Sequence, residues 1–450
     1  MAISEFNDNV FWLKNKLFRR DAIALYKEAM RNQSLSPEEL KEACFEKRVR
    51  LVRFAYENIP FYRQYYDECG FHPDNLKSEE DWNKIPILEK SYVRNQAQDM
   101  LNPYAKKKDI GETTTGGSTG MPLKVYRDKR FKLETLGWRA FSWWGVSPAD
   151  NTGITHRRVP RGLKALLANR LLWWPTKRIY ISATSMSDCE VKKFVEDINR
   201  KRIVWLTGYV GALETIANYI IKNDVTISTL RLVWSTSAPL SKSVREKLER
   251  AFRCRVMNQY GSCEVSNIAQ QCPHSEHLHI NCDFVHVDIV DENGAALCDE
   301  EGDILVTDLS NYVFPLIRYR LGDRGCLVQE QCSCGVSLPL MKNVKGRISD
   351  AVYTPSGVYV DGNYLTTIFD NYSEVIEQFQ VRQFDDYSIT IYVRKNPNAD
   401  ISAVLEKIRT QITADVKGEV PVRMELVDEI KHDRGKIRYI LSDVALSKVK

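Results

Sequence analysis

Apolar residues recur at helical spacing in the first part of the chain, from about residue 8 to residue 68. Leu25 and Ala29, for example, are four residues apart, and the repeated pattern predicts amphipathic helices. The segment Ser36–Glu39 is typical of a helix start, with a capping serine, a proline in the first turn and a glutamate three residues after the cap. Ile59-Pro60 ends the second of the helical runs, which passes through Leu51 and Ala55, because a residue that precedes proline disfavours the helical conformation.

Short apolar segments alternate with helical patterns in the middle of the chain, from about residue 110 to residue 330. Ile203–Leu206 is followed by a helical pattern at Gly211–Lys222, and Leu230–Trp234 is followed by one at Lys242–Phe252. This alternation predicts an α/β fold with mostly parallel sheets flanked by helices.

A different pattern begins near Gly346 and predicts a small α+β domain of about 100 residues. We place the boundary at Gly346–Asp350, which gives a large domain at 1–345, with a helical N-terminal segment at about 8–100, and a small mobile domain at 346–450. The elements expected in the small domain are strands at Val375–Phe384 and Tyr387–Lys395, a helix at Ile401–Val416 and a strand at Val422–Leu426.

The composition is that of a soluble globular protein, with 450 residues, 43% apolar and 27% charged. The net charge is +5, from 64 basic and 59 acidic residues, and no long basic stripe indicates nucleic-acid binding. No signal peptide and no apolar run of about 18 residues is present, so we expect a cytoplasmic protein without a transmembrane segment.

Cysteine and histidine are concentrated in one part of the sequence. Eight of the eleven cysteines lie between Cys254 and Cys334, and four of the seven histidines lie between His274 and His286. Thiols of cytoplasmic proteins rarely form disulfides, so this concentration favours metal binding. The alternative is a set of buried free thiols.

The segment Thr113–Pro122 is rich in glycine and hydroxyl residues. Glycine lets the backbone turn tightly, so that consecutive N–H groups can face an anion. The hydroxyls of Ser118 and Thr119 can add donors to phosphate oxygens. Met121 follows Gly120, so the segment is not a Walker A loop. A flexible loop without a ligand is the alternative interpretation.

Thr115–Pro122 resembles the phosphate loop of the adenylate-forming superfamily. Phe54–Tyr62 and Lys84–Lys90 extend the resemblance to the phenylacetate–CoA ligase family and its branch linked to capsular-polysaccharide biosynthesis. This resemblance covers nearly the whole chain. It implies that the loop binds the phosphates of ATP through Thr115, Gly116, Gly117, Ser118, Thr119 and Gly120.

Two further motifs of the family have counterparts. Asn258–Glu264 resembles its Tyr-Gly-x-x-Glu element, which implies nucleotide binding by Asn258, Tyr260 and Gly261 and a hard oxygen for Mg²⁺ from Glu264. Tyr319–Asp323 resembles its Tyr-Arg-Thr-Gly-Asp element, which implies that Asp323 binds the two ribose hydroxyls. The alternative is an ordinary strand turn in each case.

The resemblance also implies a hinge and a catalytic lysine. Gly346–Asp350 resembles the family hinge, with Arg347 as a contact to ribose or phosphate, although Ser349 replaces an acidic residue of many members. Arg434-Gly-Lys436 resembles the terminal lysine motif, in which the ammonium of Lys436 offsets charge at the α-phosphate. The lysine that often follows the loop proline is absent, since Leu123 stands there and Lys124 comes next.

Some members of the family hold zinc with a set of cysteines and a histidine. Carried over, the ligands are Cys272, His279, Cys332 and Cys334, with His274, His277 and Cys282 as nearby alternatives. Four protein ligands leave no open position for water, so we expect a structural Zn²⁺.

The expected activity is ATP-dependent activation of a carboxylic acid as an acyl-adenylate, followed by transfer of the acyl group to CoA or an amine. Alternatives are an aryl-CoA ligase of aromatic catabolism and a non-catalytic nucleotide-binding protein that kept the fold. His156–Arg158 and Trp143-Trp144 are candidates for the acid pocket. We also expect a homodimer.

Overall fold

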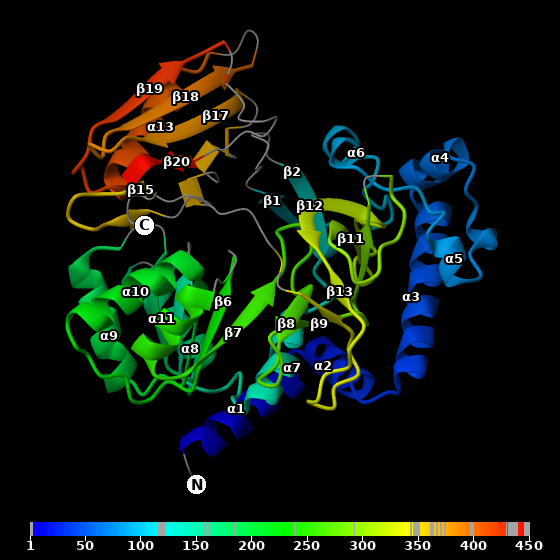
Figure 1. Ribbon diagram of the computed structural model, residues 1–450, viewed down its shortest axis with the longest axis horizontal. Helices are drawn as coiled ribbons and strands as arrows, with labels where there is room; N and C mark the ends of the chain where they lie inside the picture. The colour runs from blue at the N-terminus through cyan, green and yellow to red at the C-terminus, as the bar shows by residue number, and fades with distance from the viewer. Residues whose placement is uncertain are drawn as a thin grey trace. The chain divides into compact units, whose positions relative to one another are not determined.

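The computed structural model divides the chain into two compact units (Figure 1). The first contains Met1–Thr113, Lys124–Asp150 and Met257–Arg347, and the second contains Thr114–Leu123, Asn151–Val256 and Ile348–Lys450. The structure describes residues 3–444 apart from 116–122, 157–158, 161, 184–185, 238–239, 241, 292, 343, 345–351, 361–363, 366–367, 370, 373–374, 397–399, 429 and 431–439.

The first unit begins with the predicted helices, and their start signals are present in the structure. The Ser36 hydroxyl accepts from the Glu39 backbone N–H at 3.2 Å, and the Glu39 carboxylate accepts from the Ser36 N–H at 2.9 Å, which completes a capping box. Four helices follow one another: α1 (Ile3–Phe18), α2 (Arg20–Asn32), α3 (Pro37–Asn58) and α4 (Pro60–Glu68). Shorter helices are α5 (Glu79–Trp82) and α6 (Lys90–Asn95), with 3-10 turns at Pro73–Asn75 and Lys107–Asp109.

The strands of the first unit that follow residue 254 pair mainly antiparallel. Five of them lie in the order β13-β14-β9-β8-β7 and three in the order β10-β11-β12. The predicted alternation of strands and helices therefore ends at β7, because short connections without helices favour antiparallel pairing. The bounds are β7 (Arg255–Tyr260), β8 (Ala269–Gln271), β9 (Leu278–Ile280), β10 (Val285–Val290), β11 (Gly302–Asp308), β12 (Tyr319–Gly325), β13 (Leu327–Val328) and β14 (Leu340–Met341).

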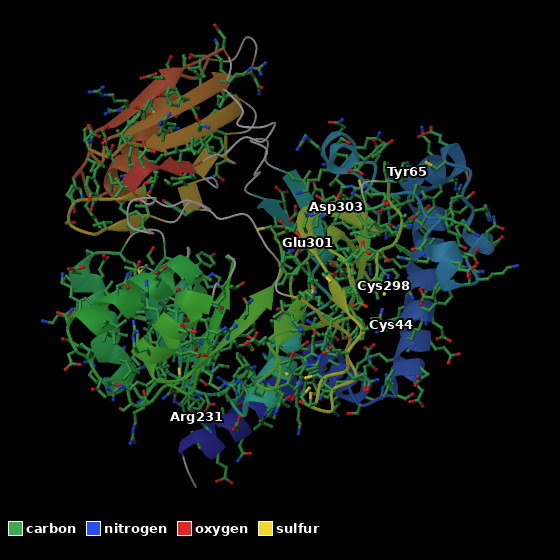
Figure 2. All side chains as sticks on the ribbon, viewed as in Figure 1. Cys44, Tyr65, Arg231, Cys298, Glu301 and Asp303 are labelled. Atoms are coloured by element: carbon green, nitrogen blue, oxygen red, sulfur yellow. The ribbon has the colours of Figure 1, made fainter. Side chains whose placement is uncertain are left out.

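The pairing of β11 with β12 positions a residue of the candidate site. Asp303 on β11, which Figure 2 labels, forms an ion pair with Arg320 on β12 at 2.5 Å. The register then shifts, so that β12 bulges between Arg320 and Arg324. Gly322 in this bulge has φ of 85°, a left-handed conformation that glycine adopts without strain. A bulge re-aims the side chains beside it, and Asp323 is one of them.

The second unit contains the parallel α/β part. Strands β6, β5, β3 and β4 are neighbours in that order and pair parallel, as the sequence predicts. Helices α9, α10 and α11 pack with these strands around one apolar core (Figure 1). The bounds are β3 (Thr152–His156), α8 (Leu163–Trp173), β4 (Arg178–Ser182), α9 (Asp188–Arg200), β5 (Trp205–Tyr209), α10 (Val210–Lys222), β6 (Leu232–Thr236) and α11 (Lys242–Phe252).

The C-terminal residues of the second unit form the predicted α+β elements. A four-stranded sheet has the order β19-β18-β17-β20, in which β17 and β18 are antiparallel and each outer strand is parallel to its neighbour. The elements are β15 (Val352–Tyr353), β16 (Tyr359–Val360), β17 (Ile376–Gln383), β18 (Ile389–Lys395), α13 (Ser402–Asp415), β19 (Val422–Leu426) and β20 (Ile440–Ser442).

Helix α7 and the strands β1 and β2 lie between residues 110 and 144. Helix α7 (Glu134–Trp144) ends at Gly145, which has φ of 63° and so caps the helix in the left-handed conformation. Strands β1 (Ile110–Thr115) and β2 (Leu123–Asp128) form a two-stranded sheet on either side of residues 116–122. Within the described residues, every helix is too short or too polar to cross a membrane.

Candidate functional site

The turn after β7 carries two of the predicted site residues, Gly261 and Glu264. The Ser262 backbone N–H donates to the Val265 carbonyl at 2.8 Å, and the Val265 N–H donates to the Ser262 hydroxyl at 3.0 Å. At Gly261 an added Cβ would lie 3.0 Å from the Asn267 backbone nitrogen. The close approach of two backbone segments therefore explains the glycine.

Tyr260 and Asp323 lie in direct contact, although they are 63 residues apart in the sequence. The Tyr260 hydroxyl donates to Asp323 Oδ2 at 3.0 Å. Burial, and then the neighbouring Asp323 carboxylate, raises the pKa of Tyr260 well above its ordinary value. The tyrosine therefore stays protonated and acts as the donor, and the carboxylate is the acceptor.

Glu264 is buried, with 7% of its surface exposed, and its carboxylate has two partners. Tyr319 donates its hydroxyl to Glu264 Oε1 at 3.5 Å, and the ammonium of Lys90 lies 3.8 Å from the same oxygen. Lys90 was not predicted as a site residue, although it ends the segment Lys84–Lys90 that carries part of the family resemblance. Its place in that motif was the only signal available in the sequence.

The other predicted nucleotide residues divide into described and undescribed ones. Asn258 is buried on β7, and its backbone N–H donates to Gln271 Oε1 at 3.1 Å. Thr115 is the last residue of β1. Outside the described residues lie Gly116, Gly117, Ser118, Thr119, Gly120, Arg347 and Lys436.

The four predicted zinc ligands come together. The ligand atoms of Cys272, His279, Cys332 and Cys334 all lie within 4.8 Å of one another. Cys272 Sγ is 3.6 Å from Cys332 Sγ, and His279 Nε2 is 3.3 Å from Cys334 Sγ. The distances match the spread of donor atoms around one small ion, since Zn–S bonds are about 2.3 Å and Zn–N bonds about 2.0 Å.

The surroundings of His279 determine which of its two ring nitrogens can bind a metal ion. His279 is fully buried, and its Nδ1 lies 3.1 Å from the Leu338 carbonyl oxygen. A carbonyl can only accept, so Nδ1 carries the proton and Nε2 keeps its lone pair toward the cysteines. Burial lowers the pKa of His279 and so favours the neutral ring.

The nearby alternatives are less suited to the cluster. His274 contributes its backbone N–H to Cys272 Sγ at 3.4 Å, and Cys282 Sγ lies 3.8 Å from Cys44 Sγ. Among the described residues, the group of close ligand atoms consists of the four predicted side chains, without His274, His277 or Cys282.

The residues named for an acid pocket have varied surroundings. Trp143 donates its indole N–H to Gln33 Oε1 at 2.9 Å and lies beside the His279 ring, with centroids 5.2 Å apart. Trp144 donates to the Gln271 carbonyl at 2.8 Å. His156 ends β3, and its ring centroid lies 5.6 Å from that of Tyr209. Residues 157–158 lie outside the described residues.

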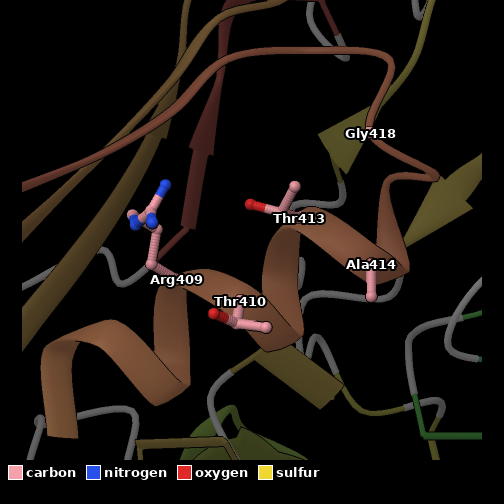
Figure 3. A pocket seen from close by; sticks show the side chains of 5 residues that line it. All are labelled: Arg409, Thr410, Thr413, Ala414 and Gly418. Atoms are coloured by element: carbon pink, nitrogen blue, oxygen red, sulfur yellow. The ribbon is translucent and has the colours of Figure 1, made fainter. Parts of the chain in front are cut away.

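A pocket of about 350 Å³ lies on α13 (Figure 3). Arg409, Thr410, Thr413, Ala414 and Gly418 line it. The charged residue, Arg409, forms an ion pair with Glu406 at 2.5 Å. None of these five residues was predicted to contact the nucleotide.

Comparison with known proteins finds relatives for the C-terminal residues and for most of the chain. Residues 352–443 match the family model of the CapK C-terminal domain. The chain is 23% identical to Protein CapK of Staphylococcus aureus over 80% of each protein. It is 24% identical to the phenylacetate-coenzyme A ligase of Thermus thermophilus, over 78% of this chain and 79% of that protein.

Solved structures show the same fold. A 2-hydroxyisobutyryl-CoA ligase, in complex with 2-HIB-AMP and CoA in the thioesterification state, has a TM-score of 0.62 at 18% identity. The match covers 93% of this chain and 94% of that one. The same ligase in the postadenylation state has a TM-score of 0.60. The chain therefore has a C-terminal part that matches the CapK C-terminal domain, is similar in sequence to CapK and to phenylacetate-coenzyme A ligases, and shares the fold of a solved CoA ligase.

Proposed function

We propose that the protein is an ATP-dependent ligase that activates a carboxylic acid as an acyl-adenylate and transfers the acyl group to CoA or an amine. The contact between Tyr260 and Asp323 carries this proposal, because it joins the two nucleotide motifs in one place. The relatives named as phenylacetate-coenzyme A ligases, and the solved ligase with its acyl-AMP and CoA, support the same chemistry.

In the first step, a carboxylate oxygen of the acid attacks the α-phosphorus of ATP. The bond from that phosphorus to the bridging oxygen breaks, and pyrophosphate leaves. Asp323 binds the ribose hydroxyls, Tyr260 holds this carboxylate in place, and Lys436 offsets the charge that develops at the α-phosphate. Glu264 would hold Mg²⁺, which would supply charge neutralisation on the phosphates.

In the second step, the sulfur of CoA or the nitrogen of an amine attacks the acyl carbonyl. The carbon–oxygen bond to AMP breaks, AMP leaves, and the nucleophile loses its proton. We propose that residues 346–450 rotate about Gly346–Asp350 between the two steps, with Arg347 at the hinge. Such a movement lets one site carry out two reactions in turn.

We propose that Cys272, His279, Cys332 and Cys334 bind a structural Zn²⁺. The donor set fits, because three thiols and one imidazole with its other nitrogen already bonded are the ligands that closed zinc sites use. The site would join the β9 region to the turn at 332–334, which lies 53 residues after His279. The Zn²⁺ takes no part in either step of the proposed reaction.

The decisive experiment is exchange of labelled pyrophosphate into ATP, with a panel of aromatic, amino, short hydroxy and uronic acids. We expect one class of acid to support exchange in the wild type and no exchange with Lys436→Ala. Lys417→Ala, which removes another lysine of the same part of the chain, serves as the matched control and should retain exchange. Absence of exchange with every acid would favour the alternative of a nucleotide-binding protein without catalysis.

A second measurement identifies the acceptor. Mass spectrometry of reactions with the active acid, with either CoA or an amine added, would show a thioester or an amide. Release of free acyl-AMP in both cases would instead mean that the reaction stops at the adenylate.

A further inference from the structure

Helix α8 exposes an unusual amount of apolar surface. Leu163 is 88% exposed, Leu167 60% and Leu171 68%, and none of the side chains of the helix is buried. A helix of a water-soluble domain normally buries one apolar stripe against its core. Helix α8 (Figure 1) therefore presents an apolar face that the described part of the fold leaves exposed.

Three of the five exposed leucines form one stripe along the helix, and Leu166 and Leu172 lie beside it. Leu163, Leu167 and Leu171 are spaced by four residues and so lie one above another on a single side. Asn169 lies on the opposite side, where its amide donates to the Tyr180 hydroxyl at 2.9 Å. The Arg178 guanidinium lies 3.2 Å from the Trp173 ring centroid. The helix is thus anchored to β4 on one side, while the leucine stripe faces away.

The stretch of sequence that contains this helix is strongly biased in charge. No acidic residue occurs between Asp150 and Asp188, although acidic and basic residues are nearly balanced over the whole chain. Arginine and lysine are frequent in the same stretch, and two of them, Lys164 and Arg170, are exposed on α8 itself. The seven basic residues are Arg157, Arg158, Arg161, Lys164, Arg170, Lys177 and Arg178.

We propose that the α8 face, defined as Leu163, Leu167, Leu171 and the adjacent Lys164 and Arg170, docks on the surface of an anionic lipid bilayer. Leucines enter the boundary between headgroups and acyl chains, and the basic side chains pair with anionic headgroups, as in interfacial helices. The helix has 11 residues, about 16 Å in length, so it lies in the plane of the surface.

The charges favour a bilayer over the other occupants. A second copy of the chain would bring two basic, acid-free stretches together, which repel one another. An acidic protein partner would satisfy the charges, but its tight binding requires a shaped groove for the leucines. A lipid surface accepts a single exposed stripe without such complementarity. The proposal does not use the nucleotide site and stands apart from the proposed activity.

The test is flotation of the full chain with lipid vesicles. We expect binding to vesicles of phosphatidylcholine with phosphatidylglycerol, much weaker binding to phosphatidylcholine alone, and release at high salt because the charges are screened. No binding to the anionic vesicles would overturn the proposal. Light scattering gives the oligomeric state of the same proteins. If the wild type is a dimer and the variant without the leucines is a monomer, the face binds a second copy of the chain and the proposal is overturned.

Matched variants distinguish vesicle binding by the α8 face from vesicle binding by exposed leucines elsewhere on the protein. The triple change Leu163→Ser, Leu167→Ser and Leu171→Ser should lower the partition coefficient by on the order of tenfold or more. The control replaces three leucines of similar exposure elsewhere, Leu13, Leu17 and Leu426, by serine and should bind as the wild type does. Equal unfolding temperatures would show that both variants fold. Loss of binding in the control alone would overturn the proposal.

Discussion

At the residue scale, the hydrogen bond in the candidate site depends on whether Tyr260 or Asp323 carries the proton. Burial raises the pKa of Tyr260, so its hydroxyl remains a donor to Asp323 Oδ2. The hydrogen bond fixes the orientation of a carboxylate that the bulge of β12 has already turned. In our proposal this orientation is what a ribose diol requires, because two hydroxyl donors must meet two acceptor oxygens.

Replacing Tyr260 by phenylalanine removes this bond and keeps the ring. We expect the KM for ATP to rise about threefold to tenfold, which corresponds to the roughly 1 kcal/mol of one hydrogen bond, while kcat changes little. Steady-state pyrophosphate exchange measures both constants. Tyr56→Phe is the matched control, since it removes a similar bond to Asp67 at 2.8 Å on the exposed surface. An unchanged KM in Tyr260→Phe would remove the positioning role.

The sequence predicts individual residues only where a motif names them. Tyr260, Asp323 and Glu264 were identified through the family resemblance, since no local pattern links positions 63 residues apart. Ser36 was predicted from local chemistry alone, because a cap acts within one turn. Lys90 was missed as a partner of Glu264, because an ion pair across 174 positions leaves no periodic trace in a single sequence.

At the element scale, periodicity predicted helices and strands well where each element buries one face. The predicted helix at Lys242–Phe252 and the predicted strand at Val422–Leu426 have the bounds of α11 and β19. The antiparallel pairing after β7 was not predicted, because pairing depends on connections and partners far along the chain. The exposed stripe of α8 was not predicted either, since an apolar helix pattern normally indicates burial.

Close packing of neighbouring strands gives a second prediction. Thr155 on β3 lies opposite Gly208 on β5, and a Cβ at Gly208 would lie 1.8 Å from the Thr155 hydroxyl oxygen. We expect Gly208→Ala to lower the free energy of unfolding by about 1–3 kcal/mol, because the added methyl group would clash with the Thr155 side chain. Chemical denaturation measures this change.

A second-site change tests the cause of that loss. The Thr155 hydroxyl is buried and has no hydrogen-bond partner in the described part of the chain. Thr155→Ala alone should therefore be close to neutral, and in the Gly208→Ala background it should recover part of the lost stability. If the two changes were simply additive, the clash would not be the reason.

The proposed zinc site predicts a metal-dependent stability. Elemental analysis of purified protein should find one zinc per chain, and Cys332→Ser should lose it. Because the ion would join segments far apart in sequence, we expect the unfolding temperature of this variant to fall by about 5–10 °C. Cys298→Ser, a change at an exposed free cysteine, is the control and should keep the metal. Wild-type protein without zinc would contradict the assignment and favour free thiols.

At the scale of the whole molecule, buried charges join segments that the sequence keeps apart. Arg139 and Asp283 are almost completely buried and form an ion pair at 2.9 Å, and Arg139 also donates to the Ala29 carbonyl. Such a network gives no pattern along the chain, so sequence analysis could not predict it. The α/β class was predictable, because it follows from the sum of many local periodicities.

Another buried network predicts how stability depends on pH. Asp288 is surrounded by His286 Nε2 at 2.9 Å, the Trp82 indole N–H at 3.1 Å and Arg318 at 3.9 Å. Burial alone would raise the pKa of Asp288, but these partners outweigh it and hold the pKa below its ordinary value of 3.8. Its stabilising contribution is thus complete above pH 3.8 and is lost as the pH falls through the lower, folded-state pKa.

Asp308 provides the opposite case in the same protein. Burial raises the pKa of this carboxyl, although Ser310 donates to it from both its backbone N–H and its hydroxyl. The folded state therefore binds the proton more readily than the unfolded state, and stability gains from Asp308 as the pH falls toward 3.8. The two carboxylates thus contribute slopes of opposite sign to the acid side of the stability curve.

Denaturant unfolding between pH 3 and pH 7 can separate the two contributions. We expect Asp288→Asn to flatten the loss of stability toward acid pH, because the variant has no proton to take up at this position. Asp308→Asn should make the same loss steeper, because the group that favours the folded state in acid is gone. Parallel curves for the wild type and Asp288→Asn would show that the partners of Asp288 do not hold its charge in the folded protein.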